Sequence, residues 1–157
     1  MLTQKQSSKI INGVKTEVVL QPFADRILIL ITQLGKVGNL IQASIPQTTP
    51  LLAQLSPDNE EPNASTLPPP PPSIQLTSLL GSAPTDHLRT LYALYASQVA
   101  TIIWTAEANG LMDERRRSVV LGLALKRSEE EENEGLSEAE RETFHQVMSM
   151  VKDLVRE

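Results

Sequence analysis

The chain has 157 residues, 40% of them hydrophobic, and a net charge of −5. That length supports one domain with a modest core. The acidic balance argues against nucleic-acid binding, which normally needs a basic surface. The absence of cysteine excludes disulfides and thiolate chemistry. The all-aliphatic run Ile27 to Ile31 falls far short of the roughly 20 residues of a membrane span. The N-terminus has no apolar run typical of a signal peptide. We therefore expect a cytoplasmic or nuclear protein without membrane contact.

The first 43 residues predict a β-meander. Asn12-Gly13, set between apolar residues, is typical of a tight hairpin turn. The run from Ile27 to Ile31 is apolar at every position, which indicates a strand whose two faces are both covered. Short connections between successive strands imply antiparallel pairing. The predicted strands are 9–11, 14–20, 27–33 and 37–43.

Residues 44–73 have a different composition. They contain nine of the eleven prolines, at positions 46, 50, 57, 62 and 68–72. Proline cannot donate to a sheet ladder and breaks a helix interior. This composition predicts a disordered insertion that interrupts the domain. A second interpretation is that Pro68 to Pro72 forms a polyproline II segment that binds a partner.

The second half predicts strands and helices in alternation. A short strand over 73–80 precedes a helix from Thr85, its N-cap, to about Asn109. Residues 119–125 form a second apolar strand, and an acidic connection over 129–134 follows it. Ser137 and Glu140 have the spacing of a capping box at the start of a C-terminal helix. The order predicts an α+β domain over 1–157, with an antiparallel β-meander sheet of about five to six strands and two helices.

Catalytic chemistry has little support in the sequence. The only histidines are His87 and His145, and neither has a recognisable ligand or base partner nearby in the sequence. The Gly35-Lys36-Val37-Gly38 segment lacks the ending of a phosphate-binding loop and leads into a predicted strand. We therefore expect a protein that is not an enzyme and that holds no metal or cofactor.

Two groups of residues are candidates for protein binding. Arg115, Arg116 and Arg117 form a basic cluster in an acidic chain, suited either to a solvated turn or to an acidic partner. Trp104 falls opposite the apolar stripe of its helix when residues are placed about 100° apart. Its neighbours on that face are the small residues Ala93, Ser97 and Ala100. A tryptophan there is either covered by the rest of the chain or part of an interface.

One block resembles a known family. The segment KTEVVLQPFADRILILITQLGKVGNLI, residues 15–41, is similar to the proteasome assembly chaperone 3 family. The resemblance extends over about residues 12–43 and, more loosely, over about 76–127. It implies a small α+β protein that forms a dimer, most simply with a sister chaperone, although a homodimer is a second option. It also implies binding to proteasome α subunits, notably the α5 subunit, during assembly of the α-ring.

Dimerisation is also expected from the residues themselves. Two strands that are apolar on both faces need more cover than two helices of one chain provide, and a second subunit is a natural source of it. A different class of function is a scaffold or adaptor that recruits partners through Pro68 to Pro72. Deletion of the insertion separates the two, since only the adaptor depends on it.

Overall fold

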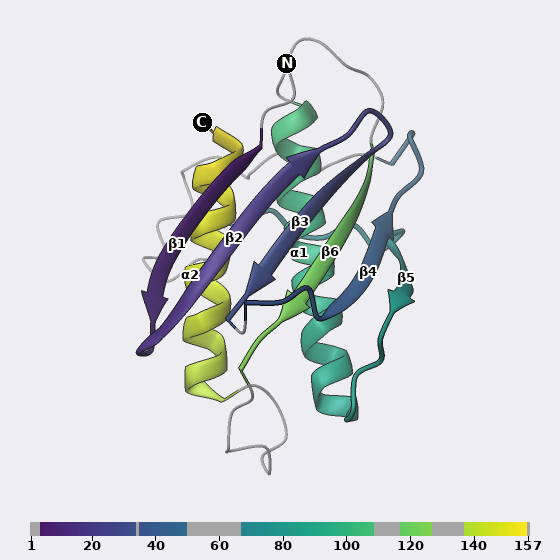
Figure 1. Cartoon of the computed structure of the whole chain (residues 1–157). Coiled ribbons are helices and arrows are strands. Elements are labelled where there is room, and N and C mark those ends of the chain that lie inside the picture. Colours follow the sequence, from purple (N-terminus) through teal and green to yellow (C-terminus); the bar gives the residue numbers. More distant parts are fainter. Residues whose placement is uncertain (1–3, 34, 50–66, 109–116, 127–136, 157) are drawn as a thin grey trace, which may run out of the picture.

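The computed structural model describes residues 4–33, 35–49, 67–108, 117–126 and 137–156 (Figure 1). They form an α+β fold, as the sequence predicts. In chain order the elements are β1 (Lys5–Ile11), β2 (Val14–Pro22), β3 (Arg26–Thr32), β4 (Asn39–Ser44), β5 (Gln75–Leu80), α1 (Asp86–Ala108), β6 (Ser118–Ala124) and α2 (Glu138–Arg156). No described helix combines the length and apolar character needed to cross a bilayer.

The sheet is mixed, with the strand order β1-β2-β3-β6-β4-β5. The meander expectation holds for β1, β2 and β3, which pair antiparallel. It is wrong beyond β3, because β6 lies between β3 and β4 and pairs parallel with β3. The reason is burial: β6 is buried along nearly its whole length, and a position between β3 and β4 pairs both of its edges.

The connection from β3 to β4 must therefore cross β6 (Figure 1). Gly38 permits this crossing. Its φ is +67°, and a Cβ built there would lie 1.9 Å from the Leu123 carbonyl oxygen of β6. Only a residue without a side chain fits so close to the neighbouring backbone.

Three local sequence signals are confirmed: one hairpin turn and two helix N-termini. Asn12 and Gly13 have φ values of 51° and 76°, as a two-residue hairpin turn of this kind requires. The Thr85 hydroxyl accepts a hydrogen bond from the Leu88 N–H at 3.1 Å and caps α1. At the start of α2, Ser137 and Glu140 exchange side chain–backbone hydrogen bonds of 3.0 and 3.1 Å. These bonds satisfy amide groups that would otherwise lack partners.

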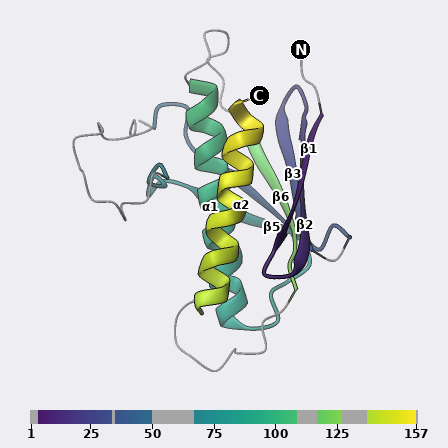
Figure 2. The ribbon, with the colours of Figure 1, turned by 90° about the vertical axis from the view of Figure 1, so that its left-hand side faces the viewer.

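Both helices lie on the same face of the sheet (Figure 2). α1 packs over β4, β5 and β6, and α2 packs over β1 and β2. Lys5 on β1 donates to the Leu154 carbonyl of α2 at 3.0 Å, and Lys9 bonds to the side chain of Gln146. The most deeply buried core residues come from both layers: Val18, Ile29, Ile31, Tyr95, Val99, Trp104, Leu121, Leu123, Val147, Met148 and Val151.

The predicted insertion has described residues at both ends. Residues 50–66 lie outside the described part of the chain, so its predicted disorder stays a prediction there. At the C-terminal end, Leu67 packs against the core and Pro68 is buried. The Pro68 carbonyl accepts a 2.8 Å hydrogen bond from the buried side chain of Gln98 on α1. The first proline of the run is thus attached to the helix layer.

Candidate functional site

The sheet face opposite the helices is the candidate functional surface. Successive strand residues point to opposite faces, so residues that alternate with the core lie on this open face. In β3, Ile27, Ile29 and Ile31 are at most 3% exposed and face the helices. Leu28 and Leu30 alternate with them and are only half-buried. The expectation that both faces of this strand are covered is thus only partly met within one chain.

Apolar residues of four adjacent strands gather at the centre of this face. We call Val19, Leu28, Leu30, Leu40 and Val120 the open-face patch. Strand pairing places Val19 beside Leu30 and Leu28 beside Val120. Leu30 and Leu40 approach from either side of Gly122, where each would contact an added Cβ. The Val37 carbonyl of the β3–β4 connection also approaches Gly122, so the absence of a side chain there makes room for these three groups.

Polar residues border the open-face patch. Gln21 and Gln42 lie beside it on β2 and β4, at positions paired with Leu28 and Val120. Lys15 and Glu17, further along β2, form an ion pair of 3.2 Å. An apolar centre with a polar border is the usual anatomy of a protein–protein interface. Strand alternation would have revealed this surface in the sequence, had the helices been known to share one face.

The structure corrects the placement of Trp104. Its side chain is 1% exposed and belongs to the core, and Ala100 is fully buried as well. The Trp104 Nε1–H donates a 2.8 Å hydrogen bond to the carbonyl of Arg117, just before β6. Neither residue can contact a partner in this conformation. Ala93 and Ser97 are partly exposed, and their predicted role in binding stays a prediction.

The error has a physical reason. A single-face description of α1 leaves one side of the helix for solvent. The C-terminal half of α1 is surrounded, so that every residue from Val99 to Trp104 is buried. The apolar stripe of α1 faces the core, and the opposite side of the helix is covered there as well.

The structure describes only one residue of the basic cluster, Arg117, and its side chain bonds within the chain. Arg115 and Arg116 lie outside the described residues. Arg117 bonds to Glu107 of α1 through Nη2 at 2.5 Å and through Nε at 3.1 Å. Its Nη1 donates to the Phe23 carbonyl in the β2–β3 turn at 2.9 Å. The Arg117 side chain thus joins α1, β6 and this turn, and its contact with an acidic partner stays a prediction.

His87 and Glu140 join the first turns of the two helices. The His87 Nε2 lies 2.8 Å from the Glu140 carboxylate, and the two side chains are 21% and 13% exposed. Burial raises the pKa of Glu140, but the hydrogen bonds from Ser137 and His87 outweigh it and hold that pKa below its ordinary value. Within the described ranges, no group of three or more His, Cys, Asp or Glu side chains is placed to hold a metal ion. His145 is exposed on α2.

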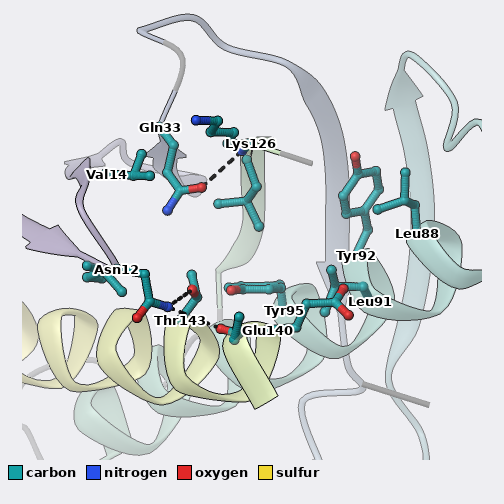
Figure 3. A pocket seen from close by; sticks show the side chains of 13 residues that line it. Asn12, Val14, Gln33, Leu88, Leu91, Tyr92, Tyr95, Lys126, Glu140 and Thr143 are labelled. Atoms are coloured by element: carbon teal, nitrogen blue, oxygen red, sulfur yellow. Dashed lines mark hydrogen bonds between the residues drawn. The ribbon is translucent and has the colours of Figure 1, made fainter. Parts of the chain in front are cut away.

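A cavity of about 240 Å³ lies at the end of the sheet near these first turns (Figure 3). It is lined by Tyr95 and by residues of the Asn12 turn, of the segment that follows β6 and of both helices. Its wall combines residues from distant parts of the chain, so no local sequence pattern indicated it.

The fold defines a class before any comparison: an α+β protein whose six-stranded mixed sheet is covered by two helices on one face. The family described as proteasome assembly chaperone 3 matches residues 29–154. Because this match covers most of the chain, the protein belongs to the proteasome assembly chaperone 3 family. The role of that family is non-catalytic.

Two individual proteins are similar to this chain in sequence. Proteasome assembly chaperone 3 of Bos taurus is 46% identical over 41 residues, which are 26% of this chain and 34% of the bovine protein. The chain thus spans about a third of that relative. An uncharacterised protein of Schizosaccharomyces pombe is 28% identical over 132 residues, covering 83% of this chain and 86% of the other.

One solved structure has the same fold. It is described as a novel chaperone complex for yeast 20S proteasome assembly, and it matches with a TM-score of 0.55. The match covers 98% of this chain and 99% of the other, at 12% sequence identity. At that identity the likeness supports the fold alone. The resemblance found in residues 15–41 is confirmed by the family match.

Proposed function

We propose that this protein is an assembly chaperone that promotes formation of the proteasome α-ring. In this proposal it binds α subunits, α5 among them, as a dimer with a sister chaperone, in the cytoplasm or the nucleus. Family membership supports the assembly role. The choice of α subunits and of α5 rests on what the family resemblance implies.

The open-face patch is the observation that carries the dimer. Leu28 and Leu30 lie on the central strand β3 and are only half-buried, and no helix of this chain packs on their side. Apolar surface gains free energy at roughly 25 cal/mol for each Å² removed from water. A sister subunit that presents an equivalent sheet face would cover this patch and complete the two-sided burial that the sequence of β3 indicates.

Replacement of Leu30 with aspartate tests this surface. Leu30 lies at the centre of the patch and is half-buried, so the subunit can fold with a carboxylate directed to solvent. Association with the sister subunit would bury that charge without a partner, which is costly. We expect Leu30→Asp to weaken association by about 2 kcal/mol or more, measured by sedimentation over a concentration series.

Leu94→Asp is the matched control. Leu94 is 42% exposed on α1, in the helix layer, and the substitution introduces the same chemical change away from the patch. It should leave association unchanged. Equal association of the two variants would contradict the proposed interface.

Affinity purification of the unmodified chain tests which partners it binds. A preparation without proteasome α subunits would contradict the chaperone role.

The adaptor interpretation receives less support. Pro68 is buried and its carbonyl is bonded to Gln98, so the proline run begins attached to α1. Replacement of Pro69 to Pro72 with Gly and Ser keeps Pro68 and its bond to Gln98 but removes the proline run. A chaperone should keep its partners after this change, whereas an adaptor that depends on the proline run should lose them.

A further inference from the structure

The cavity near the Asn12 turn opens to solvent and has both apolar and polar walls. Val14 contributes from β2, Leu125 follows β6, and Leu88, Leu91 and Tyr92 contribute from α1. Its volume is about 240 Å³. An engineered cavity of about 150 Å³ is large enough for benzene, whereas sites for drug-sized ligands start near 300 Å³. The size therefore fits one aromatic side chain and is too small for a nucleotide.

Tyr95 provides a polar group inside this cavity. The residue is 1% exposed, and its ring packs edge-on against Phe144 at a centroid distance of 5.1 Å. Its hydroxyl points away from α1 toward Asn12 and Thr143 (Figure 3). Among the described residues, that hydroxyl has no hydrogen-bond partner. Burial, with a smaller effect from Glu140, raises the pKa of Tyr95, so the hydroxyl stays neutral and is able to donate.

The amide groups of Asn12 and Gln33 on the wall already have partners. The Asn12 amide donates to the Ala139 carbonyl at 3.4 Å and to the Thr143 hydroxyl at 3.3 Å. The Gln33 amide donates to Thr16 at 3.0 Å, and its carbonyl accepts from the Lys126 backbone N–H at 2.9 Å. The Tyr95 hydroxyl has no such partner among the described residues and borders the open space of the cavity, so it is available to bond a ligand.

The rim of the cavity carries an exposed cation. Lys126 follows β6, and its ammonium group has no ion-pair partner among the described residues. The acidic group of the wall, Glu140, is already engaged by His87 and Ser137. A ligand with negative charge outside the cavity is therefore favoured over one with positive charge.

We propose that this cavity binds the side chain of a tyrosine presented by an acidic segment of a protein partner. The phenol ring lies between Val14, Leu91 and Tyr92, its hydroxyl exchanges a hydrogen bond with Tyr95, and the flanking carboxylates lie near Lys126. Only the kind of ligand, a protein segment, rests on the proposed chaperone function. The site itself rests on the cavity and the Tyr95 hydroxyl.

The hydroxyl contact is tested with p-cresol and toluene, which differ by one hydroxyl group. Their dissociation constants are measured by NMR titration of the full chain and of Tyr95→Phe, which keeps the ring packed against Phe144. The ratio between the two constants corrects for their different hydration. We expect loss of the Tyr95 hydroxyl to shift this ratio about three- to tenfold in favour of toluene. An unchanged ratio would overturn the hydrogen bond that defines the site.

The location is tested by filling the mouth of the cavity. Ala139 is exposed and lies on its wall, so Ala139→Trp should block both probes. Arg141→Trp, two residues along the same helix and also exposed, is the matched control and should bind as the unmodified chain does. Equal binding by the two variants would overturn the assignment of the probes to this cavity.

The acidic preference is tested with acetyl-Glu-Tyr-Glu-amide and acetyl-Lys-Tyr-Lys-amide. The first should bind about two- to fivefold more tightly at low salt, and Lys126→Gln should remove most of the difference. Equal affinities in the unmodified chain would overturn the charge preference. None of these measurements uses a proteasome subunit. Failure of the probes while α subunits co-purify refutes the cavity alone, and the converse result refutes only the chaperone role.

Discussion

Replacement of Trp104 with alanine should unfold much of this protein instead of separating it from a partner. The indole is 1% exposed, and its N–H holds the carbonyl of Arg117 at 2.8 Å. Removal of a buried tryptophan side chain costs about 3–5 kcal/mol through lost burial and the cavity left behind. The unpaired Arg117 carbonyl adds about 1 kcal/mol or more. A domain of this size has a total stability of roughly 5–15 kcal/mol, so the variant should be marginal.

Trp104→Phe separates the two contributions. Phenylalanine fills most of the space but cannot donate to Arg117, so we expect a smaller loss of about 2 kcal/mol. Urea unfolding followed by circular dichroism measures all the variants, since the alanine and phenylalanine chains lack tryptophan fluorescence. Leu94→Ala, an exposed position on the same helix, is the control and should change the unfolding free energy by less than about 0.5 kcal/mol.

The refuting result is specific. Suppose that the unfolding free energy of Trp104→Ala stays within about 1 kcal/mol of the unmodified chain, while its affinity for the sister chaperone falls more than about tenfold. Trp104 would then be an interface residue. The core placement, and the correction of the helix-face prediction, would then be wrong.

Further predictions concern the crossing connection and the helix starts. Gly38→Ala should destabilise the fold by more than about 2 kcal/mol, because its Cβ would overlap β6, whereas Gly35→Ala, with φ +70° and open space, should cost only about 1 kcal/mol of backbone strain; urea unfolding compares them. Glu140 has a lowered pKa when folded, so the stability from its carboxylate is present above the unfolded value near 4.5 and is lost as pH falls through the folded value. Glu140→Gln should therefore be less stable than the unmodified chain by about 1–3 kcal/mol at pH 7 and by less at pH 3. A constant difference across this pH range would contradict the carboxylate's role.

Local sequence signals predicted most of the secondary structure. The Asn12-Gly13 turn, the Thr85 cap and the Ser137 capping box depend on contacts within a few residues, and all three are present in the fold. Helix ends and tight turns are decided by short-range geometry, so the residues themselves are sufficient evidence.

The candidate surfaces were less predictable for a related reason. The half-buried leucines of β3 could be read as uncovered only once both helices were known to pack on the opposite face. The cavity joins the Asn12 turn to Tyr95 and Lys126, which lie more than 80 and 110 residues away in the chain. Such a site has no local signature.

The sequence by itself determined which segments are strands and helices, where the two helices begin, and the family to which the chain belongs. Only the tertiary structure decided that β6 enters between β3 and β4, that α1 is buried on all sides from Val99 to Trp104, and that no helix covers one face of the sheet. The physical reason is that periodicity records how apolar each side of an element is, but not which distant element covers it. Trp104 and Leu30 are the clearest cases: both are large and apolar, and packing alone places one in the core and the other on the open face.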